Sequence, residues 1–431
     1  MFKFFQSFSC LAFLFLTTFS TYAQTDTLKL SLSEAERIFL EKNYILLAQR
    51  YGIEMAKAAV TQARLLPNPN FFFMANALNP NTGKFFPFAK NSQDDIDNNN
   101  INNGQIVAQI QQLIYLAKKR SKLVALAESN TQLQFFAFED LVRTLCYQLY
   151  ATYANLYYDF KGYELLQIEE NRQEDLVRAF QVLFKQGGAS EYEVTRLEAE
   201  LQSLRADIVD LKRQIADEQA TLKIFLLQKE NVFIKPVDFA INTKAIPSLK
   251  SALDSALDHR PDLKISLEQV KNANLNLNLE KARRLPDLTA GITFETYGNA
   301  YRNFIGTYTQ IDIPLFNRNQ GNVKMAEIRL ESTQKGIENQ EVTAQSEVVN
   351  AYDKLQNLYE LNAGISQAYK DNLQTISTEA IKNYNKKVIN LLDFLDKIRT
   401  YKQAQINLIN LENNIFLQQQ YFNYVTNTRF F

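Results

Sequence analysis

Apolar residues recur every three or four positions through a long stretch in the middle of the chain. Their spacing between residues 194 and 215 is 3, 4, 3, 4, 3 and 4, at Val194, Leu197, Leu201, Leu204, Ile208, Leu211 and Ile215. A seven-residue repeat of this kind gives a helix one apolar stripe and favours left-handed packing against neighbouring helices. The pattern predicts a long helix that packs along most of its length.

The first half of the chain predicts three helices and two strands. Pro67 and Pro69 end the first helical pattern, because proline cannot continue a helix. Two strand-like segments follow, separated by a loop over 79–103 that is rich in Asn and Asp. We expect helices over about 32–66, 117–185 and 190–227, and strands over about 70–77 and 105–115.

The second half predicts the same order of elements. In its first strand Leu288, Ala290, Ile292 and Phe294 alternate with smaller or polar residues, which is typical of a strand with two different faces. We expect strands over about 287–297 and 304–313. The expected helices cover about 249–285, with a break before Pro261, then 319–384 and 390–425.

The two halves are related by internal repetition. Ala35 and Ala252, Asn43 and Arg260, and Ala56 and Ala273 match at a constant offset of 217 residues. The later helices match at an offset of 200, where Lys397 is the one polar residue opposite the stripe that begins at Val194. We therefore divide the chain into a signal peptide over 1–23, a first repeat over 24–247 and a second repeat over 248–431.

The predicted elements are unusual in length and number for a globular domain. A helix of ~70 residues is ~100 Å long, so it must extend as a hairpin bundle or coiled coil. Strands of ~10 alternating residues suit a membrane barrel, but four of them cannot close one. Two or three chains would have to share a barrel, three giving twelve strands and a wider lumen. A small soluble sheet that caps a coiled coil is the alternative.

The composition argues against one class of partner and favours long helices. The chain has 47 basic and 47 acidic residues, and this balance argues against a nucleic-acid partner. Only 12 glycines and 9 prolines occur, which favours long helices.

The first residues are typical of an export signal. A positive Lys3, an apolar stretch and the sequence Thr21-Tyr22-Ala23 predict cleavage after Ala23, with a membrane anchor as the alternative. The residue directly after the predicted cut is not a cysteine, so we expect no lipidation there. No later segment has ~18 consecutive apolar residues, and we predict no transmembrane helix.

No pattern of residues predicts an active site, a metal site or a cofactor. Asp94, Asp95 and Asp97 lie in the polar loop without the spacing of a calcium-binding loop. His259 is the only histidine and has no nearby cysteine or histidine, so we interpret it as structural. Cys146 has no cysteine partner in the mature chain. We expect a protein that is not an enzyme.

Several segments, in this order, resemble a known family. They are Leu66-Pro-Asn-Pro69, Gln109 through Lys118-Lys-Arg120, Arg260-Pro-Asp-Leu263, Leu285-Pro-Asp287 and Ile313-Pro-Leu-Phe-Asn-Arg-Asn-Gln-Gly321. Together they resemble the TolC-like outer-membrane factors, and within these the cation-efflux branch of CzcC- and CusC-like proteins. The family-motif positions are Pro67, Pro69, Arg260, Pro261, Asp262, Pro286, Pro314, Asn317, Arg318 and Gly321.

This resemblance implies a mainly α-helical fold with a small β part. It implies a homotrimer in the outer membrane of a Gram-negative bacterium, with a shared twelve-stranded barrel in the lipid and a periplasmic tunnel of long helices. It also implies a periplasmic adaptor (membrane fusion protein) and an inner-membrane efflux pump as partners. The chain would be a passive exit duct, with heavy-metal cations as the expected cargo. A duct for drugs or for type I protein secretion, and a periplasmic coiled-coil structural protein, are the alternatives.

Two tight turns between long helices are the candidate functional site. Gly187, Gly188 and Ser190 form the first, and Asn390 closes the second. Ser190 with Glu193, and Asn390 with Asp393, have the spacing of helix capping boxes. In the channel interpretation Glu191, Glu193, Asp393 and Asp396 would also form a ring of carboxylates at the periplasmic entrance, which favours cations.

Overall fold

The structure is a computed structural model that describes residues 26–78, 83, 85, 104–229, 231–237, 241, 244–297 and 301–431. The expected export signal over 1–23 lies outside the described residues, and so do Asp94, Asp95 and Asp97. None of the helices in the described ranges is both long and apolar enough to cross a membrane.

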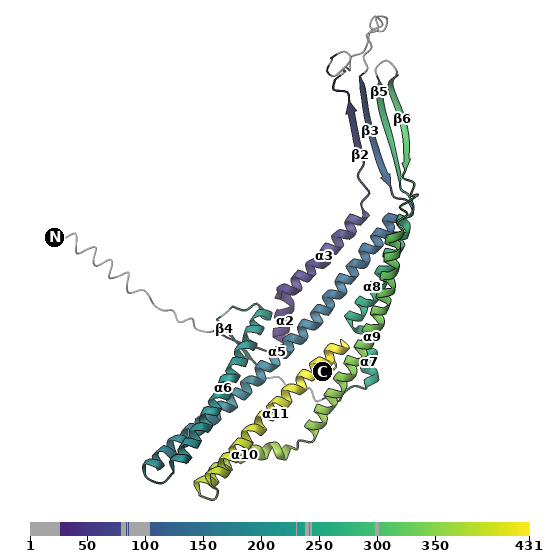
Figure 1. The fold of residues 1–431 in the computed structure, drawn as a ribbon. Helices are drawn as coiled ribbons and strands as arrows, with labels where there is room; N and C mark the ends of the chain where they lie inside the picture. The colour runs from purple at the N-terminus through teal and green to yellow at the C-terminus, as the bar shows by residue number, and fades with distance from the viewer. Residues whose placement is uncertain are drawn as a thin grey trace, which may run out of the picture. The chain divides into compact units, whose positions relative to one another are not determined.

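Helices dominate the chain, with short strands between them (Figure 1). The elements of the first half are β1 (Asp26–Leu30), α2 (Leu32–Lys42), α3 (Tyr44–Arg64), β2 (Asn70–Ala75), β3 (Gln105–Ile114), α5 (Lys119–Lys185), α6 (Glu191–Leu226) and β4 (Val232–Pro236). Those of the second half are α7 (Leu249–His259), α8 (Pro261–Arg283), β5 (Leu288–Tyr297), β6 (Tyr301–Ile311), α9 (Gln320–Ala363), α10 (Gln367–Asn385) and α11 (Leu391–Thr426).

Three of the expected helices and one residue of the apolar stripe differ from the sequence-based expectation. The helix expected over 32–66 breaks at Asn43, whose backbone is extended at φ −61° and ψ 124°. The helix expected over 319–384 breaks between α9 and α10, where Ser366 caps the second piece by accepting a hydrogen bond from the Tyr369 N–H. Helix α5 begins at Lys119, because Ala117 and Lys118 adopt left-handed backbone angles. Lys397 is exposed, and Ile398 takes the buried position beside it.

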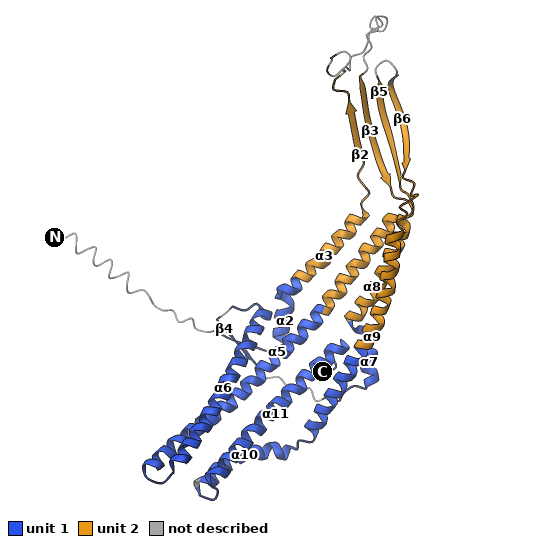
Figure 2. Cartoon of the chain, viewed as in Figure 1, with its two compact units in different colours: residues 1–47, 141–260, 344–431 blue, residues 48–140, 261–343 orange. Residues whose placement is uncertain are grey.

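The chain divides into two compact units (Figure 2). One contains Met1–Leu47, Leu141–Arg260 and Ala344–Phe431, and the other contains Ala48–Asp140 and Pro261–Thr343. Helices α3, α5 and α9 each contribute residues to both units, and each unit also has a sheet of its own.

The second unit holds a four-stranded antiparallel sheet in the order β2-β3-β5-β6. Its register pairs Ile110 with Ile292 and Gln111 with Gly291, so paired residues lie on the same face. One face collects exposed apolar side chains, namely Phe71, Phe73, Ile110, Ile292, Phe294, Ile305 and Ile311. The other face carries most of the polar residues, such as Gln105, Gln109, Gln111, Thr293 and Glu295, together with the exposed apolar side chains of Phe72, Met74 and Phe304. The clean alternation of the sequence therefore becomes a sheet with two chemically different faces.

The first unit contains a two-stranded parallel sheet that the sequence pattern did not predict. β1 pairs with β4 from Asp26 opposite Val232 to Leu30 opposite Pro236. The buried Tyr153 hydroxyl lies 2.8 Å from the Leu30 carbonyl and 3.1 Å from the Val237 carbonyl, at the ends of both strands. Strands of five residues between helices give little periodic signal, which is why they escape sequence analysis.

The core of the first unit lies between its helices. Leu166 of α5 packs against Leu204 and Ile208 of α6, so the two helices form a hairpin. α10 and α11 form a second hairpin. The apolar stripe of the sequence accounts for these contacts, because most of its members in α6 are buried.

Candidate functional site at the helix-hairpin tips

The turn that follows α5 supplies hydrogen-bond donors to the last backbone carbonyls of that helix. The Gly188 N–H donates to the Leu183 carbonyl at 2.8 Å, and the Gly187 N–H donates to the Phe184 carbonyl at 2.9 Å. This pair of hydrogen bonds is the Schellman arrangement that commonly ends a helix. Gly187 has φ of 75°, a left-handed conformation that glycine adopts without steric cost.

The turn that follows α10 has the same geometry with a different residue. The Val388 N–H donates to the Asn383 carbonyl at 2.9 Å, and the Lys387 N–H donates to the Tyr384 carbonyl at 2.8 Å. Lys387 occupies the position equivalent to Gly187, and its φ is 58°. An L-residue with a Cβ in this conformation costs about 1 kcal/mol. The second tip is therefore closed by the same hydrogen bonds but carries local strain.

Both following helices begin with a side-chain cap. The Ser190 hydroxyl accepts a hydrogen bond from the Glu193 N–H at 3.2 Å, and the Glu193 carboxylate accepts one from the Ser190 N–H at 2.8 Å. The backbone hydrogen bond from Ser190 holds the pKa of the Glu193 carboxyl below its usual value. At the second tip Asn390 Oδ1 accepts a hydrogen bond from the Asp393 N–H at 2.9 Å.

The four candidate carboxylates therefore fall into two groups. Glu193 is half-buried and is engaged in the cap of α6. Glu191 and Asp393 are exposed in the first turns of α6 and α11, and Asp396 is exposed in the second turn of α11. Asp393 contributes its backbone N–H to the cap of α11, and this bond does not involve its carboxylate. These three side chains have the solvent access that a contact with a passing cation requires.

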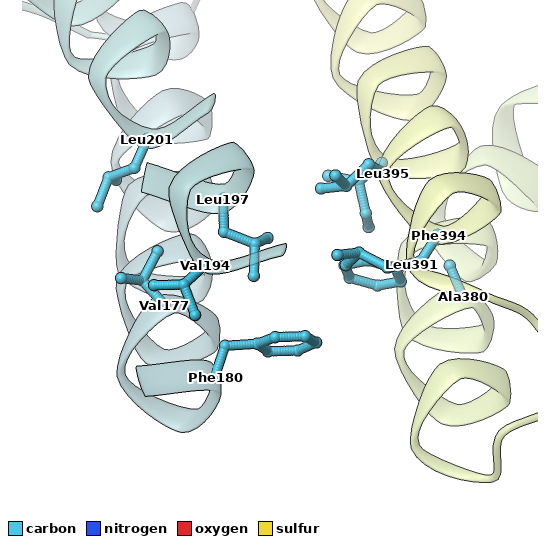
Figure 3. Packing of buried hydrophobic residues seen from close by; sticks show 10 residues of the cluster. Val177, Phe180, Val194, Leu197, Leu201, Ala380, Leu391, Phe394 and Leu395 are labelled. Carbon is cyan, nitrogen blue, oxygen red and sulfur yellow. The ribbon is translucent and has the colours of Figure 1, made fainter. Parts of the chain in front are cut away.

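An apolar cluster lies just behind the tips and joins the two hairpins (Figure 3). Leu197 of α6 and Phe180 of α5 point toward Leu395 and Phe394 of α11. The Tyr384 ring lies 5.9 Å from Phe180 and 4.9 Å from Phe394 between ring centroids. Fully burying a side chain of this size contributes ~2 kcal/mol. The cluster is therefore the main source of cohesion between the hairpins at this end.

Charged pairs continue the contact between the hairpins. Lys402 of α11 lies 3.0 Å from the Asp207 carboxylate of α6, and Arg399 pairs with Glu200. Exposed pairs of this kind contribute at most ~1 kcal/mol each. They therefore add little to the stability of the contact between α6 and α11.

Comparison with known proteins connects this architecture to one family. Residues 252–421 match the family model described as outer membrane efflux protein. The cation efflux system protein CusC of Escherichia coli strain K12 is 26% identical over 308 residues, which cover 67% of this chain and 66% of CusC. The match thus spans just under two thirds of that relative.

Solved structures have the same fold over nearly the whole chain. A crystal structure of CusC superposes with a TM-score of 0.72 at 17% identity, covering 92% of this chain and 91% of CusC. The CmeC outer membrane channel of Campylobacter jejuni gives a TM-score of 0.73 at 19% identity, over 93% of this chain and 86% of CmeC. Residues 252–421 are thus similar to the outer membrane efflux protein family, and nearly the whole chain shares the fold of the solved CusC and CmeC structures.

The motif positions singled out in the sequence lie mainly where helices end. Arg260 is only 2% exposed, and its guanidinium lies 2.7 Å from the Glu347 carboxylate and 3.2 Å from the Val425 carbonyl. Pro261 occupies the first position of α8, where its missing N–H is harmless. The Asp262 carboxylate accepts a hydrogen bond from Gln340 at 2.9 Å.

Two further family motifs, around Pro67 and Pro286, lie at junctions between helices and strands. Lys119 lies 2.8 Å from the Asp287 carboxylate and donates to the Leu285 carbonyl at 2.6 Å, so it ties together the residues on both sides of Pro286. The Pro67 carbonyl accepts a hydrogen bond from Gln112 at 2.8 Å. These contacts give both segments a structural role at the ends of the strands.

The segment from Pro314 to Asn319 forms a compact turn before α9, and Gly321 lies in the first turn of that helix. Asn317 Oδ1 accepts a hydrogen bond from the Asn319 N–H at 3.1 Å, and Arg318 donates to the Leu315 carbonyl at 3.1 Å. Asn319 adopts φ of 58°, and its amide donates to the Glu280 carboxylate at 2.6 Å. The sequence did not single out Asn319 or Glu280, although asparagine is the non-glycine residue that best tolerates left-handed angles.

No metal centre stands out in the described part of the chain. Within it, no group of three or more His, Cys, Asp or Glu side chains is placed to hold a metal ion. The His259 ring nitrogen lies 3.0 Å from the Ser255 carbonyl, one turn back along α7. Burial raises the pKa of the Cys146 thiol to about 12, which disfavours the thiolate form that reacts with electrophiles and binds metals.

Proposed function

We propose that the protein is the exit duct of a tripartite efflux system in the outer membrane of a Gram-negative bacterium. The four-stranded sheet carries this proposal, because one of its faces holds most of the exposed apolar side chains and the other holds most of the polar ones. A sheet with one lipid-facing side and one water-facing side is what a membrane channel requires. The long hairpins of the first unit would form the periplasmic part of the duct.

Three copies of the chain would complete the channel. The described sheet ends in β2 on one side and β6 on the other, and unpaired strand edges in lipid cost several kcal/mol per backbone group. Three sheets of four strands supply twelve strands, enough to close around a water-filled lumen. Detergent-solubilised protein is expected to migrate as a trimer in analytical ultracentrifugation. A protein that is monomeric and soluble without detergent would contradict this proposal.

The duct would be passive and would work with two partners, a periplasmic adaptor and an inner-membrane pump. CusC is named as a cation efflux system protein, and this relationship supports metal cations as the cargo of the present chain. A tagged copy is expected to copurify with an adaptor and a pump of the metal-cation type. Copurification with a drug pump or a protein-secretion system would instead indicate drugs or secreted proteins as the cargo.

The exposed carboxylates at the hairpin tips would select cations at the entrance. Repeated by threefold symmetry, Glu191, Asp393 and Asp396 would form a ring of negative charge, as in other cation-selective pores. The double substitution D393A/D396A should lower the preference for cations over anions in planar-bilayer recordings. Asp210→Ala, an exposed carboxylate of α6 away from the tip, is the matched control. Unchanged selectivity in the double variant would remove this role.

A further inference from the structure

A cavity of about 300 Å³ lies between the two hairpins of the first unit. Helix α5 supplies one wall, and α10 and α11 supply the other. Its apolar lining comes from Leu176, Ile381, Tyr384, Phe394, Leu395 and Ile398. The volume is at the lower end of the range of small-molecule sites, about 300 to 1,000 Å³.

Polar groups meet at one side of this cavity. Glu169 is 1% exposed and lies 3.0 Å from the Arg172 guanidinium, and both residues line the cavity. Burial raises the pKa of the Glu169 carboxyl, while Arg172 and Lys402 favour its charged form. Asp175 also lines the cavity and pairs with Arg178 on the surface. Carboxylates thus outnumber guanidinium groups in the lining.

Gln173 supplies the observation that points to a ligand. Its side chain lines the cavity, and its Oε1 atom is buried without a hydrogen-bond partner among the described residues. A buried acceptor without a donor costs ~1–3 kcal/mol, so native proteins rarely leave one unsatisfied. A ligand with a donating group would satisfy this oxygen.

We propose that the cavity binds a small amphiphile with an aromatic or aliphatic body and a protonated amine at its polar end. The amine would donate to Gln173 Oε1 and face the Glu169 carboxylate, and the apolar body would pack against Tyr384 and Phe394. The paired rings of Tyr384 and Phe394 offer the kind of surface on which an aryl group packs well. Such a ligand would contact both hairpins. The proposal does not depend on the channel function.

The test uses 4-phenylbutylamine as the probe and the full-length protein in lipid nanodiscs, so that no detergent competes for the cavity. Ligand-observed NMR, with empty nanodiscs subtracted, should give saturable binding with a dissociation constant of about 1 mM or tighter. 4-Phenylbutyrate has a similar body but an accepting carboxylate, and it should bind at least about tenfold more weakly. Equal binding of the two compounds, or no saturable binding, would overturn the proposal.

Variants locate the site. Gln173→Leu removes the acceptor at similar volume and should weaken the amine about tenfold. Gln167→Leu, an exposed residue of the same helix that does not line the cavity, should leave binding unchanged. Leu395→Trp fills the cavity from its apolar side and should abolish binding. Ala179→Trp, at an exposed lining position that tolerates a large side chain, gives the same result if Leu395→Trp fails to fold. Retained binding in Gln173→Leu and Ala179→Trp would place the amine elsewhere.

Discussion

The Arg260 guanidinium donates a hydrogen bond to the Val425 carbonyl at 3.2 Å, near the end of α11. In the other half of the chain the Asn43 amide donates to the Phe225 carbonyl, also at 3.2 Å, near the end of α6. Both donors follow the first helix of their repeat, with nearly identical backbone angles. The two repeats thus use the same contact to join their first and last helices, with an amide in one and a guanidinium in the other.

Arg260→Met should destabilise the protein more than Asn43→Ala. Arg260 also pairs with Glu347, and a broken buried ion pair costs several kcal/mol. Glu347 is partly exposed, so we expect about 2–3 kcal/mol for Arg260→Met and about 1 kcal/mol for Asn43→Ala. The measurement is thermal unfolding of the purified protein followed by circular dichroism. The double variant R260M/E347Q should recover part of the loss, and equal effects of the two single changes would contradict this ranking.

Lys387→Gly should stabilise the tip of the second hairpin. Lys387 holds φ of 58°, whereas Gly187 holds the equivalent position of the first tip. Glycine removes the steric cost of the left-handed conformation, and we expect a gain of up to about 1 kcal/mol. Lys386→Gly is the matched control, because Lys386 has φ of −84° and would only gain backbone freedom. A higher melting temperature for Lys386→Gly than for Lys387→Gly would refute this account.

The sequence predicted the architecture because its signals are long and repeated. A stripe over 22 residues and two matching halves leave few alternatives for α6, α11 and the strands. The break at Asn43 was not predicted because no proline follows it. In the second repeat Asn43 aligns with Arg260, and there Pro261 marks the equivalent break. Asn43 Oδ1 caps the next helix by accepting a hydrogen bond from the Ile45 N–H at 2.9 Å. A short polar residue in the middle of a helical pattern gives only a weak signal of this kind.

The candidate site was predictable in location but not in detail. The glycines and capping residues marked both tips, because such residues have strong positional preferences. The engagement of Glu193 in a cap and the exposure of Asp393 depend on side-chain orientation, which spacing alone does not determine. Lys397 shows the same limit. The stripe shifts by one residue to Ile398 because the spacing after Phe394 is four residues, where the equivalent spacing after Val194 is three.

Asp159→Asn should stabilise the protein at neutral pH. Burial, and then the nearby Glu218 carboxylate, raise the pKa of Asp159 to about 6. The folded state therefore binds this proton more tightly than the unfolded chain, whose carboxyl has a pKa of about 4. The favourable contribution is complete below about pH 4 and is lost as the pH rises through about 6. After allowance for partial exposure, Asn should add about 1–2 kcal/mol at pH 7.

The pH dependence of unfolding checks this prediction. The melting temperature of the Asp159→Asn variant should fall less between pH 4 and 7 than that of the wild type. Glu164→Gln changes an exposed carboxylate of the same helix and should leave the wild-type profile intact. Parallel profiles for Asp159→Asn and the wild type would show that Asp159 does not titrate in this range.

Gly291→Ala should destabilise the sheet, whereas Gly336→Ala should stabilise its helix. A Cβ on Gly291 would lie 2.5 Å from the ring of Tyr308, its cross-strand partner, whose hydroxyl donates to Gln111. The ring must move and give up this bond, at a cost of about 1–3 kcal/mol. Gly336 lies in α9 with nothing near its added methyl, so alanine gains about 0.5–1 kcal/mol of helix stability. Thermal unfolding should shift in opposite directions for the two variants.

A double variant tests the cause of the effect at Gly291. When Tyr308→Ala is already present, the added Cβ meets no ring, so Gly291→Ala should cost less there than it does in the wild-type protein. A double variant that is as unstable as the sum of its two single changes would mean that the glycine does not make room for the tyrosine ring.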